Sequence, residues 1–112
     1  MASARERATQ AMLDAKVDAL TQGLAHPLRR SILYYLADEA NGNQRTSPNE
    51  LSKALDERLT NISYHVRQLA QKGLIDLAGT APRRGALEHY YKLTQLGRMA
   101  VQTGRFAEGV NA

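Results

Sequence analysis

The hydrophobic pattern of this chain changes its period at Gly73, and this change restricts the possible folds. Before Gly73, apolar residues recur at intervals of three and four, which is the spacing of amphipathic helices. After it, the apolar run at residues 74–78 and the Tyr-rich run at residues 88–93 favour strands, and helical spacing returns after Thr94. The pattern therefore predicts a mainly α fold with a small β-hairpin, in the order α-α-α-α-β-β-α.

Start and stop signals set the expected bounds of the helices. Ser47, Pro48 and Glu50 form a strong start, because Ser47 can cap a helix, Pro48 fits its first position and Glu50 completes a capping box. Thr60 is the predicted cap of the next helix, Thr94 is the predicted cap of the last helix, and Gly23 is a predicted stop. The expected helices span residues 4–22, 27–38, 48–55, 61–72 and 95–103, a loop contains residues 41–43, and residues 104–112 are expected to fray.

Length and composition exclude several classes of protein. The 112 residues, 43% of them apolar and 23% charged, suffice for one compact domain over residues 1–112. The absence of cysteine removes disulfides, thiolate metal sites and cysteine nucleophiles. No apolar run could span a bilayer, and residues 1–10 have no apolar signal segment. A soluble cytoplasmic protein without membrane contact is therefore expected.

Charge is divided unevenly along the chain. Residues 1–57 carry seven basic and eight acidic side chains, net −1, whereas residues 58–112 carry eight basic and three acidic side chains, net +5. A basic half beside a neutral half indicates a face directed at an anionic polymer, or equally a solvated arginine-rich surface.

Residues 47–72 have the arrangement of a helix-turn-helix, with two short helices joined by a turn of three to four residues. In that motif the second helix lies in the major groove of DNA and the first helix braces it. No acidic residue lies between Arg58 and Asp76 to repel phosphates. Ile62, Val66 and Leu69 are expected to face inward, and the outward side chains of helix 61–72 are hydrogen-bonding groups suited to base edges, namely Asn61, Ser63, Tyr64, Arg67, Gln68 and Gln71.

The predicted hairpin, residues 74–93, follows the second helix as a wing would. Its loop is expected to span residues 79–87, with Arg83 and Arg84 at the tip, where they can reach phosphates or the adjoining minor groove. The candidate DNA-binding residues are therefore Ser47, Thr60, Asn61, Ser63, Tyr64, Arg67, Gln68, Arg83 and Arg84.

Three motifs give the chain a resemblance to the ArsR-type bacterial repressors. Residues 24–33 (LAHPLRRSIL) resemble the opening motif of that family, residues 61–69 (NISYHVRQL) with 72–75 (KGLI) are similar to its recognition helix and the exit into the sheet, and residues 84–85 with 88–93 (EHYYKL) resemble its wing. The resemblance covers residues 20–95. It implies a winged helix-turn-helix homodimer on a palindromic operator, with Ser63, Tyr64 and Arg67 where that family reads bases.

The chain departs from the metal-sensing members of that family, which use a Cys-containing motif before the turn or His and Asp ligands on the last helix. Cys is absent here, and His26, His65 and His89 fall on different expected elements at no metal-ligand spacing. His26 is interpreted as a helix-start residue and His65 as a structural residue at the helix–sheet junction. Neither a metal nor a cofactor is expected, and a small-molecule effector stays unspecified.

The apolar stripe of the first helix belongs either to the core or to a dimer surface, because helical spacing cannot separate the two. We expect helices 1–22 and 94–108 to pack across a two-fold axis, as the resemblance also implies, and to place two recognition helices about 34 Å apart. The expected dimer residues are Met12, Leu13, Val17, Leu20, Leu96, Met99 and Ala100.

The expected function is a dimeric, sequence-specific transcriptional regulator, most simply a repressor that occludes a promoter. Two alternatives stay open: a winged-helix module that binds a protein through the same faces, and an architectural DNA-binding protein without sequence preference. No enzymatic activity is expected, because the acidic pairs 38–39 and 56–57 fall on loops or helix ends and the sequence has no phosphate-binding glycine loop and no nucleophile elbow.

Overall fold

The computed structural model describes residues 2–38 and 45–109 of the chain. They form α1 (Ala4–Ala25), α2 (Pro27–Ala37), α3 (Pro48–Ala54), α4 (Leu59–Gln71), β1 (Ile75–Arg83), β2 (Ala86–Leu93) and α5 (Gln95–Ala107). This order confirms the expected mainly α fold with an antiparallel β-hairpin. The loop predicted at residues 41–43 lies outside the described residues.

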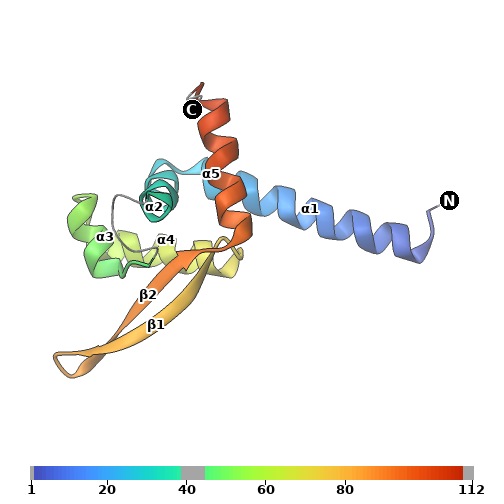
Figure 1. The fold of residues 1–112 in the computed structure, drawn as a ribbon. Coiled ribbons are helices and arrows are strands. Elements are labelled where there is room, and N and C mark those ends of the chain that lie inside the picture. Colours follow the sequence, from blue (N-terminus) through green and yellow to red (C-terminus); the bar gives the residue numbers. More distant parts are fainter. Residues whose placement is uncertain (1, 39–44, 110–112) are drawn as a thin grey trace.

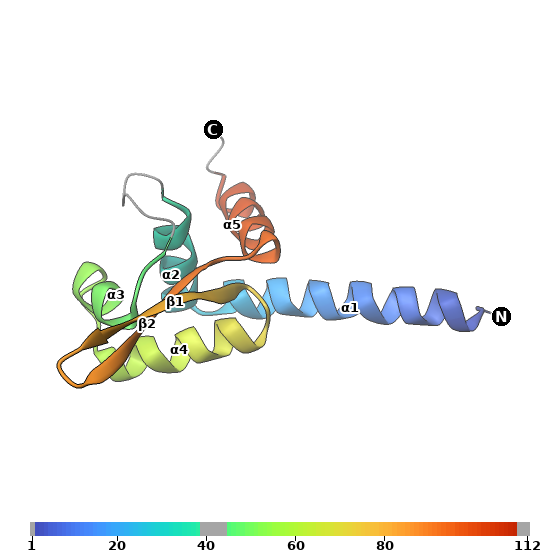
Figure 2. The same cartoon turned by 60° about the horizontal axis from the view of Figure 1, so that its bottom comes forward.

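α1 and the hairpin extend from opposite sides of a helical body (Figure 1). α2, α4 and α5 surround the centre of that body with the C-terminal end of α1, and the rest of α1 projects beyond it (Figures 1 and 2). α4 and the hairpin lie on the same side of the body (Figure 2). The molecule is consequently elongated, with extents of 58 × 35 × 22 Å.

The core lies where α2, α4, α5 and the base of the hairpin meet. Its buried apolar side chains are Ile32, Leu33, Leu36, Leu51, Ile62, Val66, Leu69, Leu74, Ile75, Leu93, Ala100 and Val101. Leu20 of α1 and Leu96 of α5 pack against this cluster while staying partly exposed. None of the described helices combines the length and the apolar character needed to cross a membrane.

Two helical glycines bring α1 and α5 close to Leu74, at the start of the hairpin. A Cβ added to Gly23 would lie 2.5 Å from Cδ1 of Leu74, and a Cβ added to Gly97 would overlap the carbonyl oxygen of Leu74. The predicted stop at Gly23 is therefore wrong, since α1 continues to Ala25. Close packing at Gly23 compensates the helix cost of glycine, about 1 kcal/mol.

The hairpin is longer than predicted, and the expected loop at residues 79–87 is wrong. β1 and β2 stay paired from Ile75 with Leu93 to Arg83 with Ala86, and a two-residue turn joins them. Both turn residues, Arg84 (φ 50°) and Gly85 (φ 81°), have the positive φ that a type I′ hairpin turn requires. Two sequence signals were misleading: a register shift next to Gly79 is absorbed inside the ladder, and Pro82 is tolerated because each strand has an unpaired edge.

The helix ends agree with the predicted caps at two positions and differ at two others. Ser47 Oγ accepts a hydrogen bond from Glu50 N (3.2 Å), and Thr94 Oγ1 accepts one from Gly97 N (3.0 Å), as predicted. Thr60 is no cap, because α4 begins at Leu59 and the Glu57 carboxylate accepts the Arg58 N–H instead. α5 also runs past the predicted end at residue 103, where Gly104 packs against Tyr34 and Leu24.

Candidate nucleic-acid interface

The turn between α3 and α4 is fixed by short hydrogen bonds. Ser52 Oγ donates to the Glu57 carbonyl (2.6 Å), and Glu57 N donates to the Ser52 carbonyl (3.0 Å). Asp56 has φ 50°, the left-handed conformation that a sharp reversal needs and that Asp tolerates better than most residues. Ile62, Val66 and Leu69 are buried beneath this turn, as the sequence predicts. The result is two short helices held at a fixed angle.

The outward face of α4 carries the polar side chains expected for base recognition. Asn61, Tyr64 and Arg67 are exposed, and Ser63 and Gln68 are half-buried. Asn61 Nδ2 donates to Glu57 Oε1 (2.9 Å), so the amide is oriented from the preceding turn. That bond and the Arg58 N–H lower the pKa of Glu57, which keeps its carboxylate ionised at neutral pH. The face is therefore mostly donors and acceptors presented to solvent.

A groove of about 430 Å³ separates this face from the hairpin. From α4 it is lined by Leu59, Ser63, Val66 and Arg67, from β2 by Leu87, Glu88, His89 and Tyr91, and from the start of α3 by Pro48 and Asn49. The groove brings the recognition face and the wing together, because both helix and hairpin border the same space.

The two arginines at the wing tip have different surroundings. Arg83 Nη1 forms an ion pair with Glu88 Oε2 at 3.0 Å, and this pairing raises the pKa of Arg83. Arg84 is exposed in the turn itself. A second hollow of about 300 Å³, between α3 and the tip, places exposed Lys53 opposite both arginines. The positive charge at this end of the molecule is therefore carried by Arg84 and Lys53 together with a partly neutralised Arg83.

One residue of the predicted DNA-binding set is buried in the structure, and four residues outside that set line the two hollows. Ser47 is fully buried, because its hydroxyl caps α3 and bonds to Glu88, so this residue cannot meet DNA as predicted. Thr60 stays exposed in the first turn of α4. Lys53, Leu59, Leu87 and His89 line the two hollows and were missed, since only the fold shows that α3 and β2 lie beside α4.

His65 lies at the corner between α1 and α2 rather than at the predicted helix–sheet junction. Its Nδ1 accepts a hydrogen bond from Arg29 Nε (3.1 Å), and its ring stacks 4.3 Å from that of His26. His26 Nδ1 in turn accepts the Leu28 N–H, which confirms His26 as the start of α2. Burial, the neighbouring His26 and the charge of Arg29 together lower the pKa of His65. The buried imidazole is thus built into the fold in its neutral form.

We expect the protein to become less stable as the pH falls below about 6.5. Because the folded-state pKa of His65 lies below 6.5, the unfolded chain takes up a proton that the folded chain does not. The contribution of His65 to stability is therefore present above pH 6.5 and is lost as the pH falls through its folded-state pKa. His65→Gln keeps an acceptor for Arg29 and removes the titration.

Urea unfolding at about pH 7.5 and about pH 5.5 measures this effect. The loss of stability between the two pH values should shrink in His65→Gln and persist in the control His89→Gln, which alters an exposed histidine of β2. An equal loss in the wild type and in His65→Gln would show that this imidazole does not control the pH dependence.

No group of three or more potential metal ligands comes together in residues 2–38 and 45–109. The two adjacent imidazoles are poorly suited to a cation, because Nδ1 of each already accepts a hydrogen bond and the Arg29 guanidinium stands beside them. Within the described residues, His26 and His65 beside Arg29 are therefore a poor site for a metal ion.

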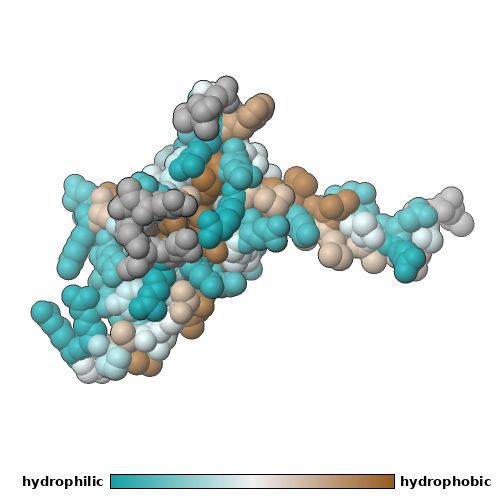
Figure 3. Space-filling model, viewed as in Figure 1, coloured by the Kyte–Doolittle hydropathy of each residue, from teal (hydrophilic) through white to brown (hydrophobic). Residues whose placement is uncertain are grey.

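Apolar side chains are exposed along α1 and α5, away from the groove. Figure 3 shows apolar surface on the part of α1 that leaves the body, where Val17 is 61% exposed and Met12 and Leu13 are exposed as well. Met99 is exposed on α5, but Ala100 lies in the core of its own chain, so it cannot belong to a dimer surface as predicted. Phe106 of the same helix is 79% exposed and is absent from the expected dimer residues.

Comparisons with known proteins identify the domain. A family model described as a helix-turn-helix domain matches residues 24–78, which run from the end of α1 into β1. Among curated proteins, none matches the sequence significantly.

Several solved structures share the fold. An ArsR family transcriptional regulator is 24% identical, with a TM-score of 0.55 over 84% of this chain and 86% of its own. MepR of S. aureus, solved as a complex with DNA, is 22% identical, with a TM-score of 0.59 over 92% of this chain and 76% of its own. A putative transcriptional regulator of Pseudomonas aeruginosa is 25% identical, with a TM-score of 0.52 over 93% of this chain and 74% of its own.

The matched domain is a helix-turn-helix, and the fold is one that solved transcriptional regulators share. The absence of cysteine separates the chain from regulators that sense metals through thiolates. The chain contains a helix-turn-helix domain, matched over residues 24–78, and with the wing formed by β1 and β2 it has the winged helix-turn-helix fold that these solved transcriptional regulators share.

Proposed function

We propose that this protein is a dimeric, sequence-specific repressor that binds double-stranded DNA at a palindromic operator. The observation that carries the proposal is the groove between α4 and the hairpin, which Ser63 and Arg67 line from the helix. The second hollow, lined by Lys53, Arg83 and Arg84, adjoins it, because Asn49, Leu87 and Glu88 border both. A DNA duplex offers matching groups on one surface, because base edges line the major groove and phosphates flank it.

In this account α4 enters the major groove and the wing follows the backbone or the adjoining minor groove. Arg67 is suited to guanine, Asn61 and Gln68 are suited to adenine, and Ser63 to either. Tyr64, 46% exposed, offers a hydroxyl and an apolar ring to the same groove. Exposed Leu59 and Leu87 frame the groove with apolar surface that can contact thymine methyl groups or sugars.

The dimer of the proposal forms through α1 and α5. Met12, Leu13, Val17 and Met99 supply its exposed apolar surface, and the half-buried Leu20 and Leu96 continue that surface toward the core. An apolar stripe on a helix that projects from its own domain is covered most simply by a second copy. Two α4 helices would then lie about one turn of DNA apart, ~34 Å. By occupying a promoter, such a dimer would repress transcription on the nucleoid, in the cytoplasm.

A titration with a random-sequence duplex at two salt concentrations tests the proposal. We expect measurable binding to random DNA that weakens steeply as salt rises, since phosphate contacts release counterions. Equal affinity for every duplex would favour an architectural DNA-binding protein. No affinity for any duplex would leave a module that binds a protein.

Arg67→Ala should lower affinity for the preferred site by about 1–3 kcal/mol and leave affinity for random DNA nearly unchanged, as the loss of a base contact does. The measurement is a pair of titrations, one on a selected duplex and one on a random duplex. Arg98→Ala is a suitable control, because it removes the same charge from the exposed surface of α5. Equal losses on both duplexes would show that Arg67 contacts phosphate rather than a base.

A further inference from the structure

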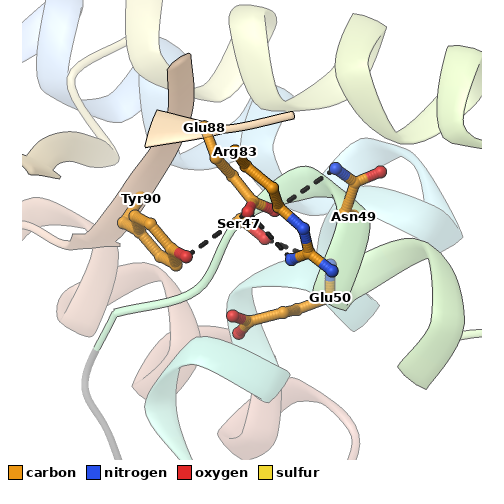
Figure 4. A network of polar contacts seen from close by, with 6 residues as sticks. All are labelled: Ser47, Asn49, Glu50, Arg83, Glu88 and Tyr90. Carbon is orange, nitrogen blue, oxygen red and sulfur yellow. Dashed lines mark hydrogen bonds and ion pairs between the residues drawn. The ribbon is translucent and has the colours of Figure 1, made fainter. Parts of the chain in front are cut away.

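Glu88 is a buried carboxylate in a hairpin whose outer part is exposed. Its side chain is 5% exposed, and four hydrogen-bond donors surround it (Figure 4). Arg83 Nη1 lies 3.0 Å from Oε2, Asn49 Nδ2 lies 3.2 Å from Oε1, and the hydroxyls of Tyr90 and Ser47 complete the set. A carboxylate is stable in such a place only when it is paired and hydrogen-bonded, and Glu88 meets that condition.

The donors belong to two parts of the molecule. Arg83 and Tyr90 come from the hairpin, whereas Ser47 and Asn49 come from the beginning of α3, the first helix of the helix-turn-helix (Figure 4). Glu88 therefore joins the wing to the helix that braces α4.

A backbone contact holds the base of the hairpin to the same segment. Thr46 N donates to the Tyr91 carbonyl (2.8 Å), and Tyr91 N donates to the Thr46 carbonyl (2.9 Å). Glu88 lies three residues closer to the tip, so its contacts oppose a rotation of the wing about that base. The backbone bonds between Thr46 and Tyr91 fix the position of the hairpin's base, and the contacts of Glu88 fix the direction in which the hairpin extends.

We propose that Glu88 is a positioning residue for DNA binding: it orients the wing relative to α4, with Arg83 as its counter-ion, and leaves Arg84 as the wing arginine that contacts phosphate. The inference rests on the proposed DNA-binding function. The sequence gives Arg83 and Arg84 equal status, but Arg83 is bonded to a carboxylate and Arg84 stands exposed in the turn.

The charge on Glu88 persists under all conditions in which DNA binding would be measured. The hydrogen bond from Ser47, the bond from Arg83 and the bond from Asn49 lower the pKa of Glu88 to about 2. The negative charge of Glu88 partly neutralises the charge of Arg83. The wing therefore presents one unpaired arginine to DNA, Arg84, rather than two.

A double-mutant cycle on DNA binding tests the assignment. Wild type, Arg84→Ala, Glu88→Gln and the double variant are titrated with one random duplex at about 50 and about 200 mM salt. In the wild-type background, Arg84→Ala should reduce the salt slope by about one, so the loss of affinity between the two salt concentrations becomes about fourfold smaller. In the Glu88→Gln background the same substitution should change the slope by less than half as much, because the wing no longer holds Arg84 at the phosphate.

Two results would overturn the proposal. One is an unchanged cost of Arg84→Ala in the Glu88→Gln background. The other is tighter binding by Glu88→Gln, which would mean that the carboxylate only masks Arg83. Glu50→Gln is the matched control, since it removes the same charge from an exposed glutamate of α3 that also acts electrostatically on Arg83, and it leaves the buried carboxylate in place (Figure 4).

A measurement without DNA separates this inference from the proposed function. Backbone order parameters of residues 80–88 should fall in Glu88→Gln, to about 0.6 or lower, and stay near those of the wild type in Glu50→Gln. Unchanged order parameters would contradict the positioning role even if DNA binding is confirmed. Conversely, a fall in order parameters in a protein that binds no duplex would refute the DNA-binding function alone.

Discussion

Val17→Glu is expected to convert the proposed dimer into a monomer and to lower affinity for a palindromic operator by about 10²–10⁴-fold, because a dimer gains its second half-site without a second encounter. Val17 is 61% exposed on the projecting part of α1, so the substitution leaves the core of the chain intact. A charge in the middle of an apolar contact costs more than the contact gains. The variant should therefore fold, sediment as a monomer and bind each half-site independently.

Ala11→Glu is the matched control for this variant. Ala11 is exposed on the same projecting part of α1, but at 100° per residue it faces away from Leu13 and Val17. Sedimentation and titration should show a dimer of nearly wild-type affinity for Ala11→Glu. A wild-type protein that sediments as a monomer at micromolar concentration, or a Val17→Glu dimer, would contradict the assignment of α1 as the dimer surface.

Leu74→Ala is expected to lower the free energy of unfolding by about 2–5 kcal/mol, the range for truncating a buried leucine. Leu74 is fully buried in the core cluster, directly before the first strand of the hairpin. Its side chain meets Gly23 of α1, and its carbonyl accepts the Thr94 N–H beside Gly97 of α5. The close approach of both glycines leaves little freedom to collapse onto the cavity, which favours the upper part of the range.

Leu77→Ala makes the same chemical change three residues along, where the leucine is 53% exposed. It should alter the free energy of unfolding by no more than about 0.5 kcal/mol. Urea or thermal unfolding of both variants gives the comparison. Similar losses in the two variants would show that Leu74 is not the point at which α1, α5 and the hairpin are held together.

Local signals in the sequence predicted the elements well. The periodicity gave the inward set Ile62, Val66 and Leu69, and the capping chemistry gave the starts at Ser47 and Thr94, because these features depend on residues within one or two turns. The order of elements and the polar outward face of α4 followed from the same local patterns.

The misleading signals were those whose meaning depends on distant parts of the chain. Gly23 and Gly97 have a cost in an isolated helix, but here they permit the contact with Leu74, which is remote in sequence. Ala100 was assigned to the dimer surface by its helical spacing, but its side chain packs in the hydrophobic core of its own chain. Ser47 was assigned to DNA because nothing near it in the sequence showed that its side chain would be buried against Glu88.

Selection of bound duplexes from a random pool is the decisive experiment for sequence-specific binding by a dimer. A two-fold symmetric dimer recognises a site with the same symmetry. The account predicts enrichment of a palindrome whose two half-sites are centred about one helical turn apart, roughly 10 base pairs. It also predicts that the enriched duplex binds at least about 10³-fold more tightly than random DNA at the same salt concentration. A pool that shows no enrichment after repeated rounds, with equal affinity before and after selection, would contradict the account.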